Sequence, residues 1–273
     1  MVDRVQVDAG GQPISRAGGT ALLLSWCVAL SVAGELTGEL APLLSCSALA
    51  WLIGLHDDFT DSSPRIRVLL LAALAVVAAS LGLSCEVVDL PGLEPLSLGV
   101  WSVPFSALWI LGATVAFDFI DGLDGLALCL GALAAACFVF AGSEGALALA
   151  ALTLAAAQVG LLAWNRPPAA FYLGDNGSNL LGFSLGALSV GSLGGEAGFP
   201  VLTALLLIAV PVADAAGTIL RRAAGDGSLF DSDMRHMHHR ILERRGSSLA
   251  ALAQLGLSAL AAALVGLTLL SLG

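Results

Sequence analysis

Apolar stretches long enough to cross a lipid bilayer recur along the whole chain and constrain its fold more than any other feature. A spanning helix needs about 20 mostly apolar residues, with a range of roughly 17–25. Only 12% of the 273 residues are charged, about half the share found in soluble domains. The sequence therefore predicts an all-α, polytopic membrane bundle with about nine transmembrane helices, forming a single membrane-embedded domain over residues 1–273. We place these helices at residues 17–34, 40–55, 68–83, 100–117, 125–142, 146–164, 178–194, 199–220 and 249–272.

The arginines indicate which side of the membrane each loop faces. The chain has no lysine, and all eleven basic residues are arginines. If all nine segments span, every arginine falls in or beside the loops of one side, which are 1–16, 56–67, 118–124, 165–177 and 221–248. The positive-inside rule makes this side cytoplasmic. We therefore expect a multi-pass protein of the bacterial inner membrane with a cytoplasmic N-terminus, an outer C-terminus and its polar motifs on the cytoplasmic face.

The first polar motif is the sequence Gly54-Leu-His-Asp57-Asp58, which is followed by Arg65 and Arg67. Mg²⁺ binds through one or two carboxylates together with substrate phosphates. Adjacent like charges also raise the pKa of one carboxylate, which suits a general base. The arginines can bind phosphate with two parallel hydrogen bonds. A solvated acidic loop remains the alternative.

The second motif carries three aspartates, Asp118, Asp121 and Asp124, followed by Gly125. If the segment is helical, this spacing puts the aspartates on one face. They repel one another there unless a cation or a ligand rich in hydrogen-bond donors neutralises them. Acidic residues at membrane depth are functional candidates. The alternative is a helix cap with additional acids.

The third motif runs from Phe171 to Asn179 and contains Gly174-Asp175-Asn176-Gly177-Ser178. Its glycines permit tight turns and a close backbone approach to phosphate. Asp175 opens an apolar segment, and a helix N-terminus favours anions and their metals. Phe171 or Tyr172 can stack on a base. Helix capping by Asp175 and Ser178, and an interfacial position for the two aromatic residues, remain alternatives.

The fourth motif holds three of the four histidines, which are His236, His238 and His239, with Arg240 next to them. The same loop contains Asp231, Asp233 and Arg235. Flanking arginines and the lack of a nearby cysteine favour phosphate contact over a zinc site. A basic loop that binds anionic lipid heads is a further alternative. Separately, Asp214 lies near the inner end of a segment, where it is either functional or paired with Arg221 or Arg222.

These four motifs, in this order, resemble those of the polyprenyl-phosphate N-acetylhexosamine-1-phosphate transferases, a glycosyltransferase family 4 type. That family carries G-x-x-DD, DGLDGLA, GDxGS and a late D-R-x-H-x-H-H loop. The matching stretches here are Gly54–Asp58, Asp121–Ala127, Gly174–Ser178 and His236–His239. The H-x-H-H spacing with Asp233 upstream is most similar to the undecaprenyl-phosphate GlcNAc-1-phosphate transferase branch.

The sequence also departs from the family pattern. The family usually has one more helix before the region that matches Asp3–Gly19, and basic residues and histidine where Gly10, Gly11 and Gln12 stand here. Asp118 replaces the asparagine that usually precedes DGLDGLA, and Met234 replaces the arginine of the histidine loop.

The resemblance implies an enzyme that transfers HexNAc-1-phosphate, expected to be GlcNAc-1-phosphate, from a UDP-sugar to undecaprenyl phosphate. The reaction releases UMP and initiates a cell-envelope glycan. Mg²⁺, with Mn²⁺ as the alternative, is expected on Asp175 and on Asp58 or Asp57; the other member of the pair deprotonates the lipid phosphate or acts as nucleophile. The expected catalytic residues are Asp57, Asp58, His236 and His238. The expected substrate-binding residues are Arg67, Asp118, Asp121, Asp124, Phe171, Asn176, His239 and Arg240.

Other functions remain open beside this one. A catalytically degenerate relative or a transporter would bind the UDP-sugar or a lipid-linked sugar, but a transporter more often places polar groups near the bilayer midplane. A CDP-alcohol transferase or an aromatic prenyltransferase would share the aspartates and leave the third and fourth motifs unexplained. We expect membrane lipid around the protein and no nucleic-acid partner. Whether the protein forms a homodimer stays open.

Overall fold

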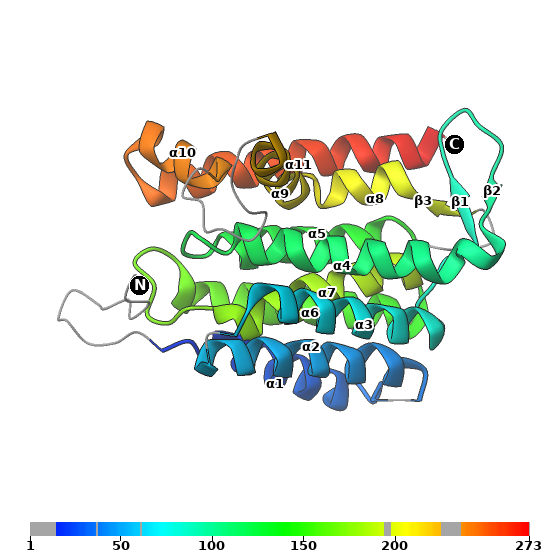
Figure 1. Cartoon of the computed structure of the whole chain (residues 1–273), viewed down its shortest axis with the longest axis horizontal. Coiled ribbons are helices and arrows are strands. Elements are labelled where there is room, and N and C mark those ends of the chain that lie inside the picture. The colour runs from blue at the N-terminus through cyan, green and yellow to red at the C-terminus, as the bar shows by residue number, and fades with distance from the viewer. Residues whose placement is uncertain (1–14, 37, 61, 194–197, 225–235, 273) are drawn as a thin grey trace.

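The computed structural model describes residues 15–36, 38–60, 62–193, 198–224 and 236–272 as a bundle of helices with a small sheet at one end (Figure 1). The helices are α1 Gly18–Val32, α2 Ala41–Thr60, α3 Pro64–Ser80, α4 Ser102–Ile120, α5 Leu126–Phe140, α6 Gly145–Asn165, α7 Gly174–Leu193, α8 Val201–Leu207, α9 Ala209–Ala224, α10 Met237–Arg245 and α11 Ser248–Leu272. Each predicted apolar segment coincides with one helix, except that 199–220 is divided between α8 and α9.

Among the described residues, four helical regions are long and apolar enough to cross a membrane; they are Gly38–Thr60, Gly99–Ile120, Gly145–Asn165 and Ser248–Ser271. Together α8 and α9 meet the same criteria, although their axes differ by 89°. The apolar helices α1 and α5 are shorter, with 15 residues each. The chain thus has the architecture of a helical, multi-pass membrane protein with four or five helices of spanning length, and nine spans stay a prediction.

Helix α7 packs most extensively against α2 and α4. Glycines allow this close approach. A Cβ on Gly182 would lie 2.6 Å from the Cα of Thr114 in α4, and a Cβ on Gly54 would overlap the backbone of Asp175. Because glycine has no Cβ, the helix backbones come into direct contact at these positions. The acidic ends of α2 and α4 therefore lie beside the first turn of α7.

The chain turns sharply between α8 and α9. Pro211 lies in the first turn of α9, where the missing N–H costs no helical hydrogen bond. The turn directs α9 along a different axis from α8 and buries Asp214 and Thr218, which are 1% and 0% exposed. A sharp break inside an apolar segment is not visible in the hydropathy of residues 199–220.

The small sheet was not expected from the sequence, which predicts helices and loops alone. It consists of β1 Val87–Asp89, β2 Leu96–Ser97 and β3 Phe199–Pro200, in the order β2-β1-β3. β1 pairs antiparallel with β2, and parallel with β3, where Val88 lies opposite Phe199. The sheet lies at the opposite end of the bundle from α10 (Figure 1). It joins the 84–99 loop to the start of α8, and the protein remains helical in its main architecture.

Candidate active site

Arg67 lies among three aspartates that come from three other helices. Its Nη1 donates to Oδ2 of Asp57 at 2.5 Å and to Oδ2 of Asp175 at 2.8 Å, and its Nη2 donates to Oδ2 of Asp118 at 3.0 Å. The arginine side chain is 16% exposed, so these charge-assisted bonds are partly shielded from water. The first three motifs therefore meet at one point. One guanidinium faces three carboxyl groups, and burial together with the nearby Asp118 raises the pKa of Asp175 to about 8.

Asp58 is directed differently from its neighbour Asp57. Its Oδ2 accepts hydrogen bonds from the backbone N–H of Asn176 at 3.0 Å and from the Asn176 side-chain amide at 2.6 Å. Its Oδ1 accepts the backbone N–H of Asp175 at 3.2 Å and lies 3.5 Å from Nη1 of Arg16. The carboxylate thus binds the free N–H groups at the start of α7, where the helix dipole favours a negative charge.

A cavity of about 420 Å³ opens at this cluster. Its volume is in the range of small-molecule sites. Five aspartates and two arginines contribute to its wall, together with Tyr172; the charged residues are Asp58, Asp118, Asp121, Asp124, Asp175, Arg16 and Arg67. This excess of acid makes the cavity attractive to cations and to groups that donate hydrogen bonds.

The second motif is not a continuous helical stripe. Helix α4 ends at Ile120, and residues 121–125 form a turn that ends at Gly125 with a positive φ of 76°. Asp118 is therefore the only one of the three aspartates on the helix. In the turn, partial burial and the carboxylates of Asp175 and Asp118 raise the pKa of Asp121 well above its ordinary value. The helical spacing does not apply here because α4 ends at Ile120, before Asp121 and Asp124.

Asn165, which the sequence interpretation missed, holds this turn in place. Its Oδ1 accepts the N–H of Gly125 at 3.0 Å, and its Nδ2 donates to the backbone oxygen of Phe171 at 2.7 Å. Nearby, Oδ2 of Asp124 accepts the N–H of Ala169 at 3.1 Å. The loop between α6 and α7 is thereby tied to the second motif. A polar residue at the end of an apolar segment, just before two prolines, was the available signal.

The third motif divides its residues between the cavity and the protein interior. Tyr172 lines the cavity, whereas Phe171 is not among its wall residues. Asn176 is fully buried, and its amide donates to Asp58 and to the backbone oxygen of Arg16 at 2.9 Å. Tyr172 is thus better placed than Phe171 to stack on a base. The hydrogen bonds of Asn176 hold the site together, and its predicted contact with substrate stays a prediction.

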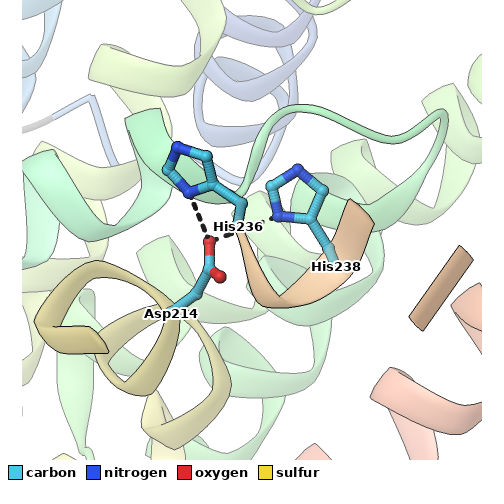
Figure 2. Close-up of side chains that lie close together, drawn as sticks. All are labelled: Asp214, His236 and His238. Carbon is cyan, nitrogen blue, oxygen red and sulfur yellow. Dashed lines mark hydrogen bonds and ion pairs between the residues drawn. The ribbon is translucent and has the colours of Figure 1, made fainter. Parts of the chain in front are cut away.

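The histidine motif converges on Asp214, the acid that the sequence left unassigned. Oδ2 of Asp214 lies 3.0 Å from Nδ1 of His236 and 3.2 Å from Nδ1 of His238 (Figure 2). Oδ1 of Asp214 accepts the backbone N–H of Met237. Among the described residues, Asp214, His236 and His238 form a group of three whose metal-ligating atoms lie within 4.8 Å of one another. Asp214 therefore contacts the fourth motif, and a functional role for it stays a prediction.

The histidine group meets the cavity at Gly122, which lies in the wall. A Cβ on Gly122 would overlap Nε2 of His238. His239 is half-buried, and burial together with the neighbouring His238 and His236 lowers its pKa. Arg240 is exposed. In the described part of the chain, the cavity wall includes none of the histidines and not Arg240. Asp231, Asp233, Met234 and Arg235, and the N-terminal Gly10, Gly11 and Gln12, lie outside the described residues.

Comparison with known proteins gives consistent matches. A model of glycosyl transferase family 4 matches residues 40–193, more than half of the chain. A probable undecaprenyl-phosphate N-acetylglucosaminyl 1-phosphate transferase of Bacillus subtilis is 30% identical, over 83% of this chain and 65% of that protein. An undecaprenyl-phosphate alpha-N-acetylglucosaminyl 1-phosphate transferase of Thermotoga maritima is 31% identical, over 72% of this chain and 60% of that protein.

A decaprenyl-phosphate N-acetylglucosaminephosphotransferase of Mycolicibacterium smegmatis is 31% identical, over 86% of this chain and 67% of that protein. The chain thus spans 60–67% of the length of these three relatives. The family match covers the first three motifs, and the structure brings their residues to one cavity. The chain belongs to glycosyl transferase family 4.

Proposed function

We propose that this protein transfers GlcNAc-1-phosphate from UDP-GlcNAc to undecaprenyl phosphate, releases UMP and so initiates a cell-envelope glycan. The observation that carries the proposal is the meeting of Asp57, Asp118 and Asp175 at Arg67. All of these except the buried Asp57 lie in the wall of a polar cavity. Carboxylates and an arginine in one cavity suit a diphosphate substrate with its cation. The names of the relatives from Bacillus subtilis and Thermotoga maritima support the same reaction.

The residues fit a divalent cation of the Mg²⁺ or Mn²⁺ type. Asp57 and Asp175 both bind Nη1 of Arg67, at 2.5 and 2.8 Å, so a positive group already bridges the two carboxylates. Hard cations of this kind take oxygen ligands, and Mg²⁺ uses one or two carboxylates plus phosphates and water. We propose Asp175 and Asp57 as the metal ligands. Asp58, the other predicted ligand, is less suited because its oxygens accept three N–H bonds from α7.

The reaction requires an oxygen of the lipid phosphate to attack the sugar-bound phosphorus, while the bond from that phosphorus to the oxygen of UMP breaks. Bound Mg²⁺ would neutralise the charge that develops on the leaving phosphate. Arg67 would turn from the aspartates to the diphosphate, because a guanidinium binds phosphate oxygens in pairs. Asp121 and Asp124 would orient the nucleotide from the turn, and Tyr172 would stack on the uracil. Asp58 would keep the first turn of α7, and with it Asp175, in place.

An apolar groove supports a lipid acceptor. It has a volume of about 290 Å³ and runs between α4 and the bent pair α8 and α9, where Leu108, Trp109 and Val212 contribute to its wall. The groove also includes Ala116 and Ile219. Ala116 lies beside the site because it is two residues before Asp118. Ile219 lies beside the histidines because it follows Thr218, which contacts His236. A prenyl chain in this groove would place its phosphate near the aspartates and histidines.

We further propose that all nine apolar segments cross the bacterial inner membrane, with the site on the cytoplasmic side. The distribution of arginines supports this topology. Arg16, Arg67 and the cavity aspartates share one end of the bundle, as the cavity wall indicates. A cytoplasmic site would meet UDP-sugars where these are made.

The test is a measurement of UMP release from UDP-GlcNAc by the purified protein in detergent, with undecaprenyl phosphate and Mg²⁺, and with EDTA as control. Release that requires both the lipid and the metal supports the transferase. A protein that binds UDP-GlcNAc and releases no UMP with any UDP-sugar would instead be a degenerate binding relative. Replacement of UDP-GlcNAc by other UDP-HexNAc donors then identifies the sugar.

A further inference from the structure

Asp214 receives three hydrogen-bond donors on one buried carboxylate. The residue is 1% exposed and lies in α9, whereas its partners lie at the start of α10. The backbone N–H of Met237 binds Oδ1, and the Nδ1 atoms of His236 and His238 lie 3.0 and 3.2 Å from Oδ2. A buried carboxylate is stable when donors satisfy its oxygens. Figure 2 shows the second ring nitrogen of each histidine pointing away from Asp214.

The surroundings of His236 determine which of its ring nitrogens carries the proton. Oγ1 of Thr218 lies 3.3 Å from Nδ1 of His236. The hydroxyl hydrogen of Thr218 goes to the backbone oxygen of Asp214, at 2.9 Å, so Oγ1 acts as an acceptor toward the histidine. Both neighbours of Nδ1 are therefore acceptors. His236 carries its proton on Nδ1 and shares it between the carboxylate and the hydroxyl.

The same argument applies to His238, whose Nδ1 faces the carboxylate oxygen of Asp214. Its other nitrogen, Nε2, is buried and has no hydrogen-bond partner among the described residues. Buried ring nitrogens without a partner are uncommon and call for an explanation. This atom lies against Gly122 in the cavity wall, at a place that any larger side chain would occupy. The one unsatisfied hydrogen-bonding group of the ring therefore lies directly behind Gly122, at the edge of the cavity.

A metal ion on Asp214, His236 and His238 is the competing interpretation of this cluster. Metal binding uses a nitrogen lone pair, so each Nδ1 would have to lose its proton. His236 would then face Oγ1 of Thr218 with two lone pairs opposed, because the Thr218 hydrogen is already engaged with the backbone of Asp214. Hydrogen bonds among the described residues satisfy the Nδ1 atoms of His236 and His238 and both oxygens of Asp214 without an ion. They favour a network of donors over a metal site.

We propose that Asp214 is a positioning residue that fixes His236 and His238 as Nδ1–H imidazoles and holds Nε2 of His238 against Gly122 in the cavity wall. The effect of Asp214 on turnover rests on the proposed function, whereas the positions of the two imidazoles follow from the hydrogen bonds alone. Asp214 acts through the histidines and does not itself line the cavity. The effect resembles that of outer partners of metal-bound histidines, whose loss commonly costs about 10–100-fold in activity.

The first experiment measures the imidazole tautomers without reference to activity. Protein labelled with ¹⁵N-histidine gives ring-nitrogen shifts that distinguish Nδ1–H from Nε2–H, and the variants His236→Asn and His238→Asn assign the signals. The expected result is two Nδ1–H histidines in the native protein and a change of both in Asp214→Asn. Nε2–H tautomers at His236 and His238 in the native protein would overturn the proposal. So would one equivalent of zinc in the purified protein that is lost in Asp214→Asn.

The second experiment asks whether Asp214 acts through the histidines, by a double-mutant cycle on UMP release. Asparagine at position 238 keeps an N–H near the place of Nδ1 and removes Nε2. We expect Asp214→Asn to lower kcat/KM by about 10–100-fold in the native background, and by less than about threefold when His236 and His238 are both asparagine. Equal losses in both backgrounds contradict the proposal. Glu243→Gln, an exposed carboxylate on α10, is the control that leaves kcat/KM unchanged.

The two measurements separate this inference from the proposed function. If the native protein releases no UMP, the transferase proposal fails while the tautomers still decide the role of Asp214. If UMP release is normal and the tautomers are the reverse of those expected, the transferase stands and the positioning role fails. Thermal unfolding of each variant in detergent identifies those that do not fold. Thr218→Val leaves the Asp214 carboxylate beside both histidines, so both should keep the Nδ1–H tautomer in this variant. A change of the His236 tautomer would show that Thr218, and not Asp214, fixes it.

Discussion

Nη1 of Arg67 lies 2.8 Å from Oδ2 of Asp175, although the two residues are 108 positions apart in the chain. The contact joins the second turn of one helix to the first turn of another, and the same nitrogen also binds Asp57 at 2.5 Å. A cation that bridges two carboxylates balances charges that would otherwise repel each other. The guanidinium thus occupies the position in which we propose a divalent metal, and release of Arg67 to phosphate would accompany metal and substrate binding.

Asp175→Asn should abolish turnover, because the amide keeps the shape of the side chain and loses the negative charge. We expect UMP release to fall by at least about 100-fold, the size of effect that follows when a directly interacting catalytic group is lost. Titration with Mg²⁺ should not restore it. The measurement is initial rate against Mg²⁺ concentration at saturating UDP-GlcNAc and undecaprenyl phosphate. Near-normal turnover of the variant would contradict the assignment of Asp175 as a metal ligand.

Asp57→Asn and Asp58→Asn should have different effects, although the two residues are adjacent. Asp58 accepts three N–H bonds from α7 and its side chain is 6% exposed. Loss of its charge should reduce stability by about 1–3 kcal/mol, since hydrogen bonds to charged groups are worth about that much. Asp57→Asn should lower the thermal midpoint as well, because its buried carboxylate accepts hydrogen bonds from Arg67 and Ser62. Of the two variants, only Asp57→Asn should raise the Mg²⁺ concentration needed for half-maximal rate. The check is thermal unfolding in detergent beside a Mg²⁺ titration, and the reverse pattern would return the metal to Asp58.

Sequence reasoning located the apolar helices and the carboxylates that line the cavity. It did not show in which direction those side chains point. The lengths of the apolar segments alone predict the positions of α1 to α7 and α11, because the apolar residues that a spanning helix needs are consecutive in the sequence. The opposite directions of Asp57 and Asp58 depend on α7, which is more than 100 residues further along. The partnership of Asp214 with His236 and His238 depends on the 89° bend between α8 and α9. Hydropathy does not encode such a bend, and the three short strands depend equally on tertiary contact.

Asp121→Asn should stabilise the protein at neutral pH. Burial and nearby carboxylates raise the pKa of Asp121 well above its ordinary value, so the folded protein binds this proton more tightly than the unfolded chain. Stability is therefore lost as the pH rises from the ordinary aspartate range through the raised pKa. Asparagine removes that penalty. We expect a higher thermal midpoint than the native protein at pH 7 and none of this gain near pH 4.

Asp124→Asn is the control for that comparison, because its carboxylate accepts the N–H of Ala169. It should give no increase in thermal midpoint at pH 7. If Asp121→Asn lowers the midpoint at pH 7, the turn is stabilised by the ionised carboxylate, and repulsion among the cavity aspartates is not the dominant effect. If the variant is also less active, the charge of Asp121 serves the reaction at the expense of stability.

Gly122→Ala should impair the reaction without unfolding the protein. Gly122 has no positive φ that would exclude alanine, and a Cβ at this position would overlap Nε2 of His238. The imidazole is held at its other nitrogen by Asp214, so it can escape the methyl group only by breaking that hydrogen bond. We expect kcat/KM for UMP release to fall by about 10-fold or more, comparable with the loss of a positioning contact. Gly160→Ala, in α6 with open space around its Cβ, is the matched control. Equal rates for the two variants would show that Nε2 of His238, behind Gly122, plays no part in turnover.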